Sequence, residues 1–188
     1  MKKNADRMFI GFPMSQAPTA IAAFNFFFSN ESFDTIIELG SGRGGLSLFL
    51  AVVAFLTDGN FRTFDIKDNP RLDSRLKSLG FKYEKLNVLN NAGINELKGT
   101  IRNGGRTLFM CDNGNKIKEV NTYSKFLKEN DVIMAHDYFR RRKDHDKKLW
   151  NSCEITYDDI KKACDENGIE DFYRNHFENV FWFCGRKV

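Results

Sequence analysis

The sequence has few of the features on which several classes of protein depend. Its four cysteines are scattered without a C-x-x-C pair, so neither a zinc knuckle nor a disulfide framework is indicated. The longest apolar stretch, Leu46 to Leu56, is far shorter than the roughly 20 residues of a membrane span. Met1 to Arg7 leads into no apolar segment typical of a secretory signal. We therefore expect a soluble, cytoplasmic protein without a membrane partner.

The composition that is present fits one globular domain, residues 1–188. Nineteen phenylalanines predict a core dominated by aromatic packing, and such a chain is also compatible with a homodimer. A net charge of +4 permits an anionic substrate without requiring nucleic acid.

Short apolar runs alternate with longer segments of helical periodicity. The runs predict strands at 35–39, 61–66, 83–88, 105–110, 131–135 and 180–184. The periodic segments predict helices at 17–30, 46–56, 71–79, 116–128 and 156–166. This alternation predicts an α/β fold, with a doubly wound, mostly parallel, seven-stranded sheet of Rossmann type in a single domain. We divide the domain into an entry loop and helix (1–30), a cofactor-binding core (31–138), a candidate lid loop (139–157) and a C-terminal helix and strands (158–188).

Polar side chains follow most of the predicted strands at the point where each strand ends. Doubly wound sheets bind their ligands at the carboxyl ends of the strands. We therefore expect one site to be formed there by Glu38, Asp65, Asn87, Asp112, His136 and Asp137.

A glycine-rich loop joins the first predicted strand to the helix after it. Gly40, Gly42 and Gly45 match G-x-G-x-x-G, and Asp65 follows at the distance at which an acid binds ribose hydroxyls in dinucleotide-binding proteins. Glu38 favours a different nucleotide, because a carboxylate there suits a ligand that bears an ammonium group. The pattern acid-x-Gly-x-Gly-x-Gly also resembles the first motif of class I methyltransferases. A third interpretation is a strand–turn–helix corner whose glycines serve packing alone.

Two carboxylates and a histidine after neighbouring strands form a plausible divalent-cation site. Asp112 and Asp137 suit Mg²⁺, whereas His136 shifts the preference towards Mn²⁺, Fe²⁺ or Zn²⁺. His136 and Lys116 are the candidate general bases, the lysine only if its pKa is strongly lowered. The alternatives are that the two aspartates cap helices, that His136 is structural and that Lys116 is a solvated residue of a first helical turn.

Three segments resemble one broad class I family, which groups small-molecule O-methyltransferases with cephalosporin-hydroxylase-like and rhamnosyl O-methyltransferase-like proteins. They are residues 11–18 (GFPMSQAP), residues 36–48 around the glycine loop, and residues 112–138, from Asp112-Asn-Gly-Asn to His136-Asp137-Tyr138. The resemblance implies S-adenosylmethionine as methyl donor and often a divalent metal, Mg²⁺ or Mn²⁺ here, held by Asp112 and Asp137. Position 136 is acidic in some relatives and histidine in others. The cofactor-binding residues expected are Gln16, Glu38, Gly40, Ser41, Gly42, Gly44, Asp65, Asn87 and Asp112.

The sequence also departs from that family. Asn115 replaces a histidine that many relatives carry after the first acid, and Asn130-Asp131 replaces the usual Gly-Gly before the fifth strand. The first change argues against histidine-based proton transfer at position 115.

A basic run, Arg140 to Lys143, follows the fifth core strand. It is either a solvated loop or a lid that attracts an anionic substrate, with Trp150 and Tyr157 closing over the site. The chain lacks the distributed basic and aromatic stripe of single-stranded nucleic-acid binders, so a nucleic-acid partner is disfavoured.

The leading hypothesis is an O-methyltransferase for a small hydroxylated acceptor, which the sequence does not name. Three alternatives stay open: a nucleic-acid methyltransferase, a non-catalytic module that binds S-adenosylmethionine or a nucleotide, and a small NAD-binding domain.

Overall fold

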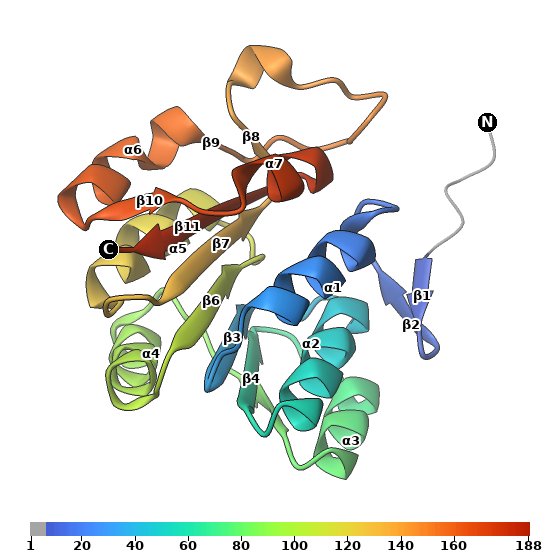
Figure 1. Ribbon diagram of the computed structural model, residues 1–188. Helices are drawn as coiled ribbons and strands as arrows, with labels where there is room; N and C mark the ends of the chain where they lie inside the picture. The colour runs from blue at the N-terminus through green and yellow to red at the C-terminus, as the bar shows by residue number, and fades with distance from the viewer. Residues whose placement is uncertain (1–6) are drawn as a thin grey trace.

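A seven-stranded sheet runs through the centre of the protein and carries helices on both faces (Figure 1). The computed structural model describes residues 7–188, so the first six residues of the predicted entry segment lie outside the described residues. The sheet order is β5–β4–β3–β6–β7–β11–β10. Its strands are β3 (Thr35–Leu39), β4 (Asn60–Asp65), β5 (Lys82–Lys85), β6 (Thr107–Cys111), β7 (Val132–His136), β10 (Ile169–Asp171) and β11 (Trp182–Lys187).

The strands are parallel except at one edge of the sheet. β5, β4, β3, β6 and β7 are parallel to one another, whereas β11 is antiparallel to both β7 and β10. Every residue of β3, β6 and β7 is buried, as expected for strands covered on both faces. β3 pairs with β4 on one side and β6 on the other, so the winding reverses there. The predicted doubly wound, mostly parallel sheet is confirmed.

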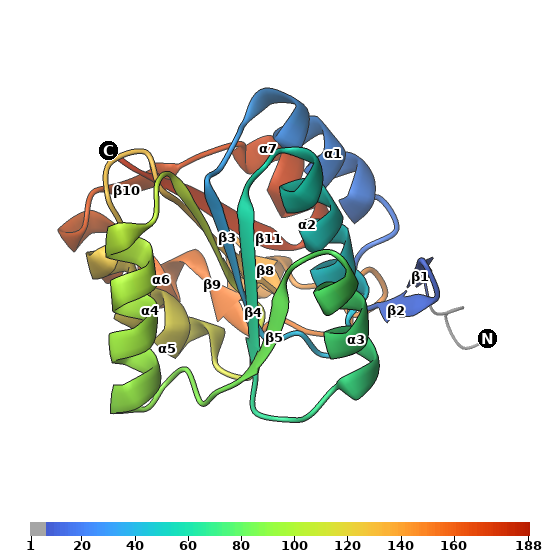
Figure 2. The ribbon, with the colours of Figure 1, turned by 90° about the horizontal axis from the view of Figure 1, so that it is seen from below.

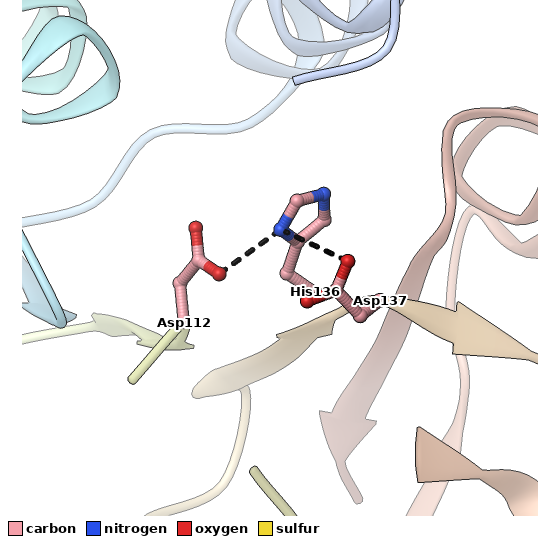
Figure 3. Close-up of side chains that lie close together, drawn as sticks. All are labelled: Asp112, His136 and Asp137. Atoms are coloured by element: carbon pink, nitrogen blue, oxygen red, sulfur yellow. Dashed lines mark hydrogen bonds and ion pairs between the residues drawn. The ribbon is translucent and has the colours of Figure 1, made fainter. Parts of the chain in front are cut away.

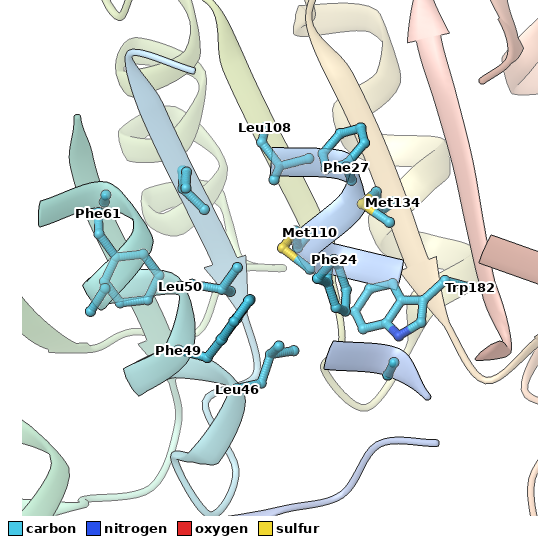
Figure 4. Close-up of a cluster of buried hydrophobic side chains, with 14 of the residues drawn as sticks. Phe24, Phe27, Leu46, Phe49, Leu50, Phe61, Leu108, Met110, Met134 and Trp182 are labelled. Carbon is cyan, nitrogen blue, oxygen red and sulfur yellow. The ribbon is translucent and has the colours of Figure 1, made fainter. Parts of the chain in front are cut away.

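Two helical layers enclose the sheet (Figure 2). One face is covered by α1 (Ala20–Asn30), α2 (Gly45–Leu56), α3 (Pro70–Ser78) and α7 (Arg174–Phe177). The other is covered by α4 (Asn91–Asn103), α5 (Lys116–Tyr123) and α6 (Tyr157–Glu166). On the first face, Phe24 and Phe27 of α1 pack over the sheet, and the ring centroid of Phe24 lies 5.6 Å from that of Trp182 (Figure 4). The core is therefore rich in aromatic contacts, as the composition predicts.

Side-chain caps determine where several helices begin. The side chains of Asn69, Asn90 and Asn115 each accept a hydrogen bond from a backbone N–H in the first turn of α3, α4 and α5. At α6 the backbone N–H of Thr156 donates to the Asp159 carboxylate at 2.8 Å, which completes the capping box that the sequence predicts.

Several observed elements differ from the predicted ones in their bounds or were not predicted. The entry segment contains an antiparallel hairpin of β1 (Arg7–Phe9) and β2 (Phe12–Met14), and α1 begins at Ala20 instead of residue 17. Helix α4 was not predicted, because Gly93 and Gly99 weaken its helical pattern. β5 ends at Lys85, three residues before the predicted end. The predicted helix 116–128 is α5 followed by the 3₁₀ turn η1 (Ser124–Phe126).

The predicted lid loop contains a second small sheet. Strand β8 (Tyr138–Phe139) pairs in parallel with β9 (Ile155–Thr156), and the 3₁₀ turn η2 (Arg142–Asp144) lies between them in the chain. A further 3₁₀ turn, η3 (Glu178–Val180), precedes β11. Among the described residues, no helix combines the length and apolar content that a membrane crossing requires.

Candidate functional site

Two cavities open at the carboxyl ends of the parallel strands, on either side of the point where the winding reverses. The first, of about 230 Å³, lies between the glycine loop and the ends of β6 and β7. The second, of about 610 Å³, lies between that loop, the end of β4 and the start of α5. They share Gly40, Gly42, Arg43 and Asp112 as lining residues, so they form two parts of one recess.

Glycine is required in the loop by the closeness of neighbouring backbone. Gly40 has φ +90°, and a Cβ atom there would lie 2.4 Å from the carbonyl oxygen of Asp112. A Cβ on Gly45 would lie 2.5 Å from the carbonyl oxygen of Pro13. Two separate segments thus press against the loop, which leaves its outer side facing the first cavity.

Glu38 is a buried carboxyl at the edge of the first cavity. Its Oε2 accepts a hydrogen bond of 2.6 Å from the Thr63 hydroxyl, while its buried Oε1 has no hydrogen-bond partner among the described residues. Ser41 and Thr63 share a further hydroxyl contact of 2.6 Å. Burial raises the pKa of Glu38 to about 8. An unpartnered buried oxygen of this kind is a position where a ligand donor would fit.

Asp65 forms part of the second cavity at the end of β4. Its Oδ2 accepts the N–H of Gly42 and its Oδ1 accepts the N–H of Lys67, both at 3.1 Å. The carboxylate therefore connects the glycine loop to the β4 end. Tyr83, from β5, lines the same cavity, and its hydroxyl donates to the carbonyl of Lys67.

Asp112, His136 and Asp137 converge between β6 and β7 (Figure 3). Nδ1 of His136 lies 2.9 Å from Oδ1 of Asp112 and 4.0 Å from Oδ1 of Asp137. One potential ligand atom from each residue lies within 4.8 Å of the others. Asp137 has φ +56°, a left-handed conformation that aspartate adopts more readily than most residues other than glycine. Helix capping does not explain Asp112, because Asn115 caps α5.

His136 contacts two indole rings. Its ring stacks on Trp182 at 4.7 Å and lies 5.4 Å from Trp150. Nδ1 faces Asp112, whereas the buried Nε2 points away and has no hydrogen-bond partner among the described residues (Figure 3). A metal bound through Nδ1 requires the proton on Nε2, whereas a base acting through Nε2 requires it on Nδ1. The two roles predicted for His136 are therefore mutually exclusive.

Lys116 is buried beside the aspartates and is not a solvated residue. Its Nζ lies 3.2 Å from Asp137, 2.7 Å from Glu154 and 3.7 Å from Asp112. Burial by itself lowers the pKa of Lys116. The three carboxylates together raise it by more than burial lowers it, so the net pKa lies above the ordinary value. The candidate role of Lys116 as a base needs a strongly lowered pKa, which the neighbouring carboxylates oppose.

Gln16 connects the entry segment to this cluster. Its buried amide donates to Asp112 Oδ2 at 3.2 Å, and its carbonyl oxygen accepts from the Trp182 indole at 2.8 Å. Both polar ends of the amide are satisfied, so its orientation is fixed. Ser15 also lines the first cavity, as the predicted entry loop suggests.

Of the two aromatic residues expected beside a lid, Trp150 lies at the first cavity and Tyr157 does not. The Trp150 indole lines the first cavity, donates to Asp137 Oδ1 at 2.6 Å and stacks on Phe181 at 5.1 Å. Tyr157 lines neither cavity, because its ring packs under the guanidinium of Arg140 at 3.9 Å. The three consecutive arginines pair with acids of the chain itself, as Arg140–Asp171, Arg141–Asp144 and Arg142–Asp159.

Most of the predicted cofactor residues meet in this recess. Those that line it are Gln16, Glu38, Gly40, Ser41, Gly42, Gly44, Asp65 and Asp112. Asn87 does not, because β5 ends early and the exposed Asn87 side chain accepts the N–H of Leu89 at 3.0 Å. The sequence analysis missed Glu154 and Trp182, which no motif marks. Trp182 alone had a signal, since it falls within the predicted last strand.

The fold is that of S-adenosylmethionine-dependent methyltransferases with solved structures. The chain is similar to CmcI with Mg and SAM (TM-score 0.68, 13% identity, covering 97% of this chain and 76% of that one). It is similarly close to CmcI with SAH (TM-score 0.67, 13% identity, 99% and 85% coverage). A third structure is geranyl diphosphate C-methyltransferase from Streptomyces coelicolor A3(2) (TM-score 0.57, 10% identity, 90% and 79% coverage). No protein-family model and no curated protein matches the chain.

Proposed function

We propose that this protein transfers a methyl group from S-adenosylmethionine to an oxygen of a small hydroxylated molecule. The observation that carries the proposal is the recess at the β3–β6 reversal, where the glycine loop, Glu38, Asp65 and the Asp112 cluster meet. The likeness to CmcI structures with SAM and SAH supports the choice of cofactor.

The recess offers polar groups for two parts of the cofactor, the ammonium and the ribose hydroxyls. The free Oε1 of Glu38 suits the ammonium of the methionyl part, and Asp65 in the larger cavity suits the ribose hydroxyls. The backbone of Gly40, Ser41, Gly42 and Gly44 allows close approach, and Gln16 covers the smaller cavity. S-adenosylmethionine, when bound, supplies the sulfonium methyl group that the acceptor oxygen attacks.

The charges of the cluster fit a divalent cation. Three carboxylates, those of Asp112, Asp137 and Glu154, lie within 3.7 Å of the ammonium of Lys116. We propose that Asp112, Asp137 and Nδ1 of His136 hold Mg²⁺ or Mn²⁺. Such an ion would lower the pKa of an acceptor hydroxyl. Alternatively, Nε2 of His136 accepts the hydroxyl proton. This nitrogen has no hydrogen-bond partner among the described residues, so its lone pair is available.

Calorimetry with S-adenosylhomocysteine tests the cofactor assignment. We expect binding to wild type that is at least about tenfold weaker in Asp65→Asn, a change that retains hydrogen-bond acceptor capacity but removes the charge. Asp165→Asn, on the exposed side of α6, is the matched control and should bind as wild type does. Binding of NAD in place of S-adenosylhomocysteine would return the glycine loop to the dinucleotide interpretation. Transfer of labelled methyl to a panel of catechols and sugars then identifies the acceptor.

A further inference from the structure

The ammonium of Lys116 lies inside the acidic cluster and contacts both proposed metal-binding aspartates. Its side chain is only 5% exposed, with Nζ 3.2 Å from Asp137 Oδ2 and 3.7 Å from Asp112 Oδ1. A single positive charge therefore already neutralises part of the charge that would attract a divalent cation. The ammonium and a divalent cation would contact the same two carboxylates. The two positive charges would then lie close together and repel each other.

The same ammonium has a second set of partners that includes no proposed metal ligand. Nζ donates to Glu154 Oε2 at 2.7 Å and to the Asn113 carbonyl at 2.9 Å. Glu154 is fixed beside the cluster, because its backbone N–H donates to the Asp137 carbonyl at 3.0 Å and β9 begins at the next residue. Lys116 can thus keep two partners when the aspartates turn to a metal ion.

We propose that Lys116 is a built-in competitor for divalent cations, and that Glu154 with the Asn113 carbonyl retains its ammonium when a cation binds. The proposal rests on the metal part of the proposed function. Metal affinity then depends on how readily the ammonium of Lys116 gives up its contacts with the two aspartates. The proposal also links the cation to the lid, because Glu154 lies at the end of the segment that carries Trp150.

Calorimetric titration with MnCl₂ at constant pH tests the competition directly and needs no acceptor. We expect Lys116→Met, which keeps the length of the side chain without its charge, to bind Mn²⁺ at least about tenfold more tightly than wild type. Lys118→Met removes the same charge from an exposed position on the same helix and should bind as wild type does. Tight binding by Lys116→Met alone, with none measurable in wild type, equally supports the proposal.

Glu154→Gln tests the second half of the exchange. We expect weaker Mn²⁺ binding than in wild type, because the ammonium then stays with the aspartates. In the Lys116→Met background the same change should have little effect, since Glu154 acts through Lys116. An equal loss in both backgrounds would show that Glu154 attracts the metal itself, which overturns its assigned role.

Unchanged or weaker Mn²⁺ binding by Lys116→Met overturns the competition, provided that the variant is folded. Folding is checked by thermal melting, and Lys116→Gln serves as a second uncharged variant. Absence of Mn²⁺ binding in every variant overturns this inference together with the metal assignment. S-adenosylhomocysteine binding by the same samples separates that result from a failure of the methyltransferase proposal.

Discussion

Gly40 lies against the backbone of Asp112 so closely that any side chain at position 40 would collide with it, since a Cβ would stand 2.4 Å from the Asp112 carbonyl oxygen. The contact joins the end of β3 to the end of β6. It therefore sets the distance between the glycine loop and the acidic cluster, the two halves of the proposed site.

We expect Gly40→Ala to destabilise the protein and to abolish S-adenosylhomocysteine binding. The positive φ alone costs about 1–2 kcal/mol for a residue with a Cβ, and the backbone overlap adds to that. Urea unfolding measures the first effect and calorimetry the second. Gly99→Ala, in the middle of α4 with open space around its Cβ, should stabilise the protein by about 0.5–1 kcal/mol. Equal stability of the two variants would contradict the close-contact interpretation.

Glu38 should make the stability of the ligand-free protein fall as the pH rises. Burial raises its pKa from 4.5 to about 8, so the folded state holds a proton that the unfolded state loses. The stability from this proton is complete below pH 4.5 and is lost as the pH rises through about 8. The effect approaches about 1.4 kcal/mol per pH unit within this window. Denaturant unfolding between pH 5 and pH 9 should give a flatter profile for Glu38→Gln; parallel profiles would refute the assignment.

Intrinsic fluorescence should report directly on the site. The sequence has two tryptophans, Trp150 and Trp182, and both rings lie beside His136. We expect S-adenosylhomocysteine to change the emission of wild type, and Trp150→Phe to retain the part of the change that comes from Trp182. The phenylalanine keeps an aromatic ring against Phe181 but loses the indole hydrogen bond to Asp137. A saturating ligand without any spectral change would place binding away from the first cavity.

His136→Gln distinguishes the two roles of the histidine. If Nδ1 holds the metal ion, Mn²⁺ affinity should fall by more than the roughly tenfold that loss of an outer-shell partner causes, while S-adenosylhomocysteine binding is retained. Calorimetry of both ligands provides the readout. Normal Mn²⁺ affinity combined with a large loss of methyl transfer would instead assign Nε2 as the base.

The sequence predicts the parts of the site that depend on local pattern. The ends of β3, β4, β6 and β7 follow from buried runs that stop at acids, and glycine spacing marks the loop after β3. Asn87 was misplaced because apolar residues continue past the true end of β5, so the strand looks longer than it is. Helix α4 was not predicted because its two glycines, Gly93 and Gly99, weaken the helical pattern.

Long-range packing determines the remaining contacts, and no local pattern contains it. Glu154 reaches Lys116 only because β9 pairs with β8 next to Asp137. Trp182 reaches His136 only because β11 enters the sheet antiparallel to β7, with the two residues in register. In the sequence, Lys116 looks like an ordinary residue of a first helical turn. Only the fold brings the carboxylates of Asp112, Asp137 and Glu154 around it.

The hydrogen bond between Gln16 and Trp182 joins residues 166 positions apart. Both side chains also touch the acidic cluster, so the wall of the first cavity closes only when the entry segment and β11 are in place together. A partly folded chain with an ordered glycine loop would still lack a complete pocket. The stoichiometry of S-adenosylhomocysteine binding should therefore count fully folded molecules in a preparation, and serve as an assay of folding quality before any acceptor is known.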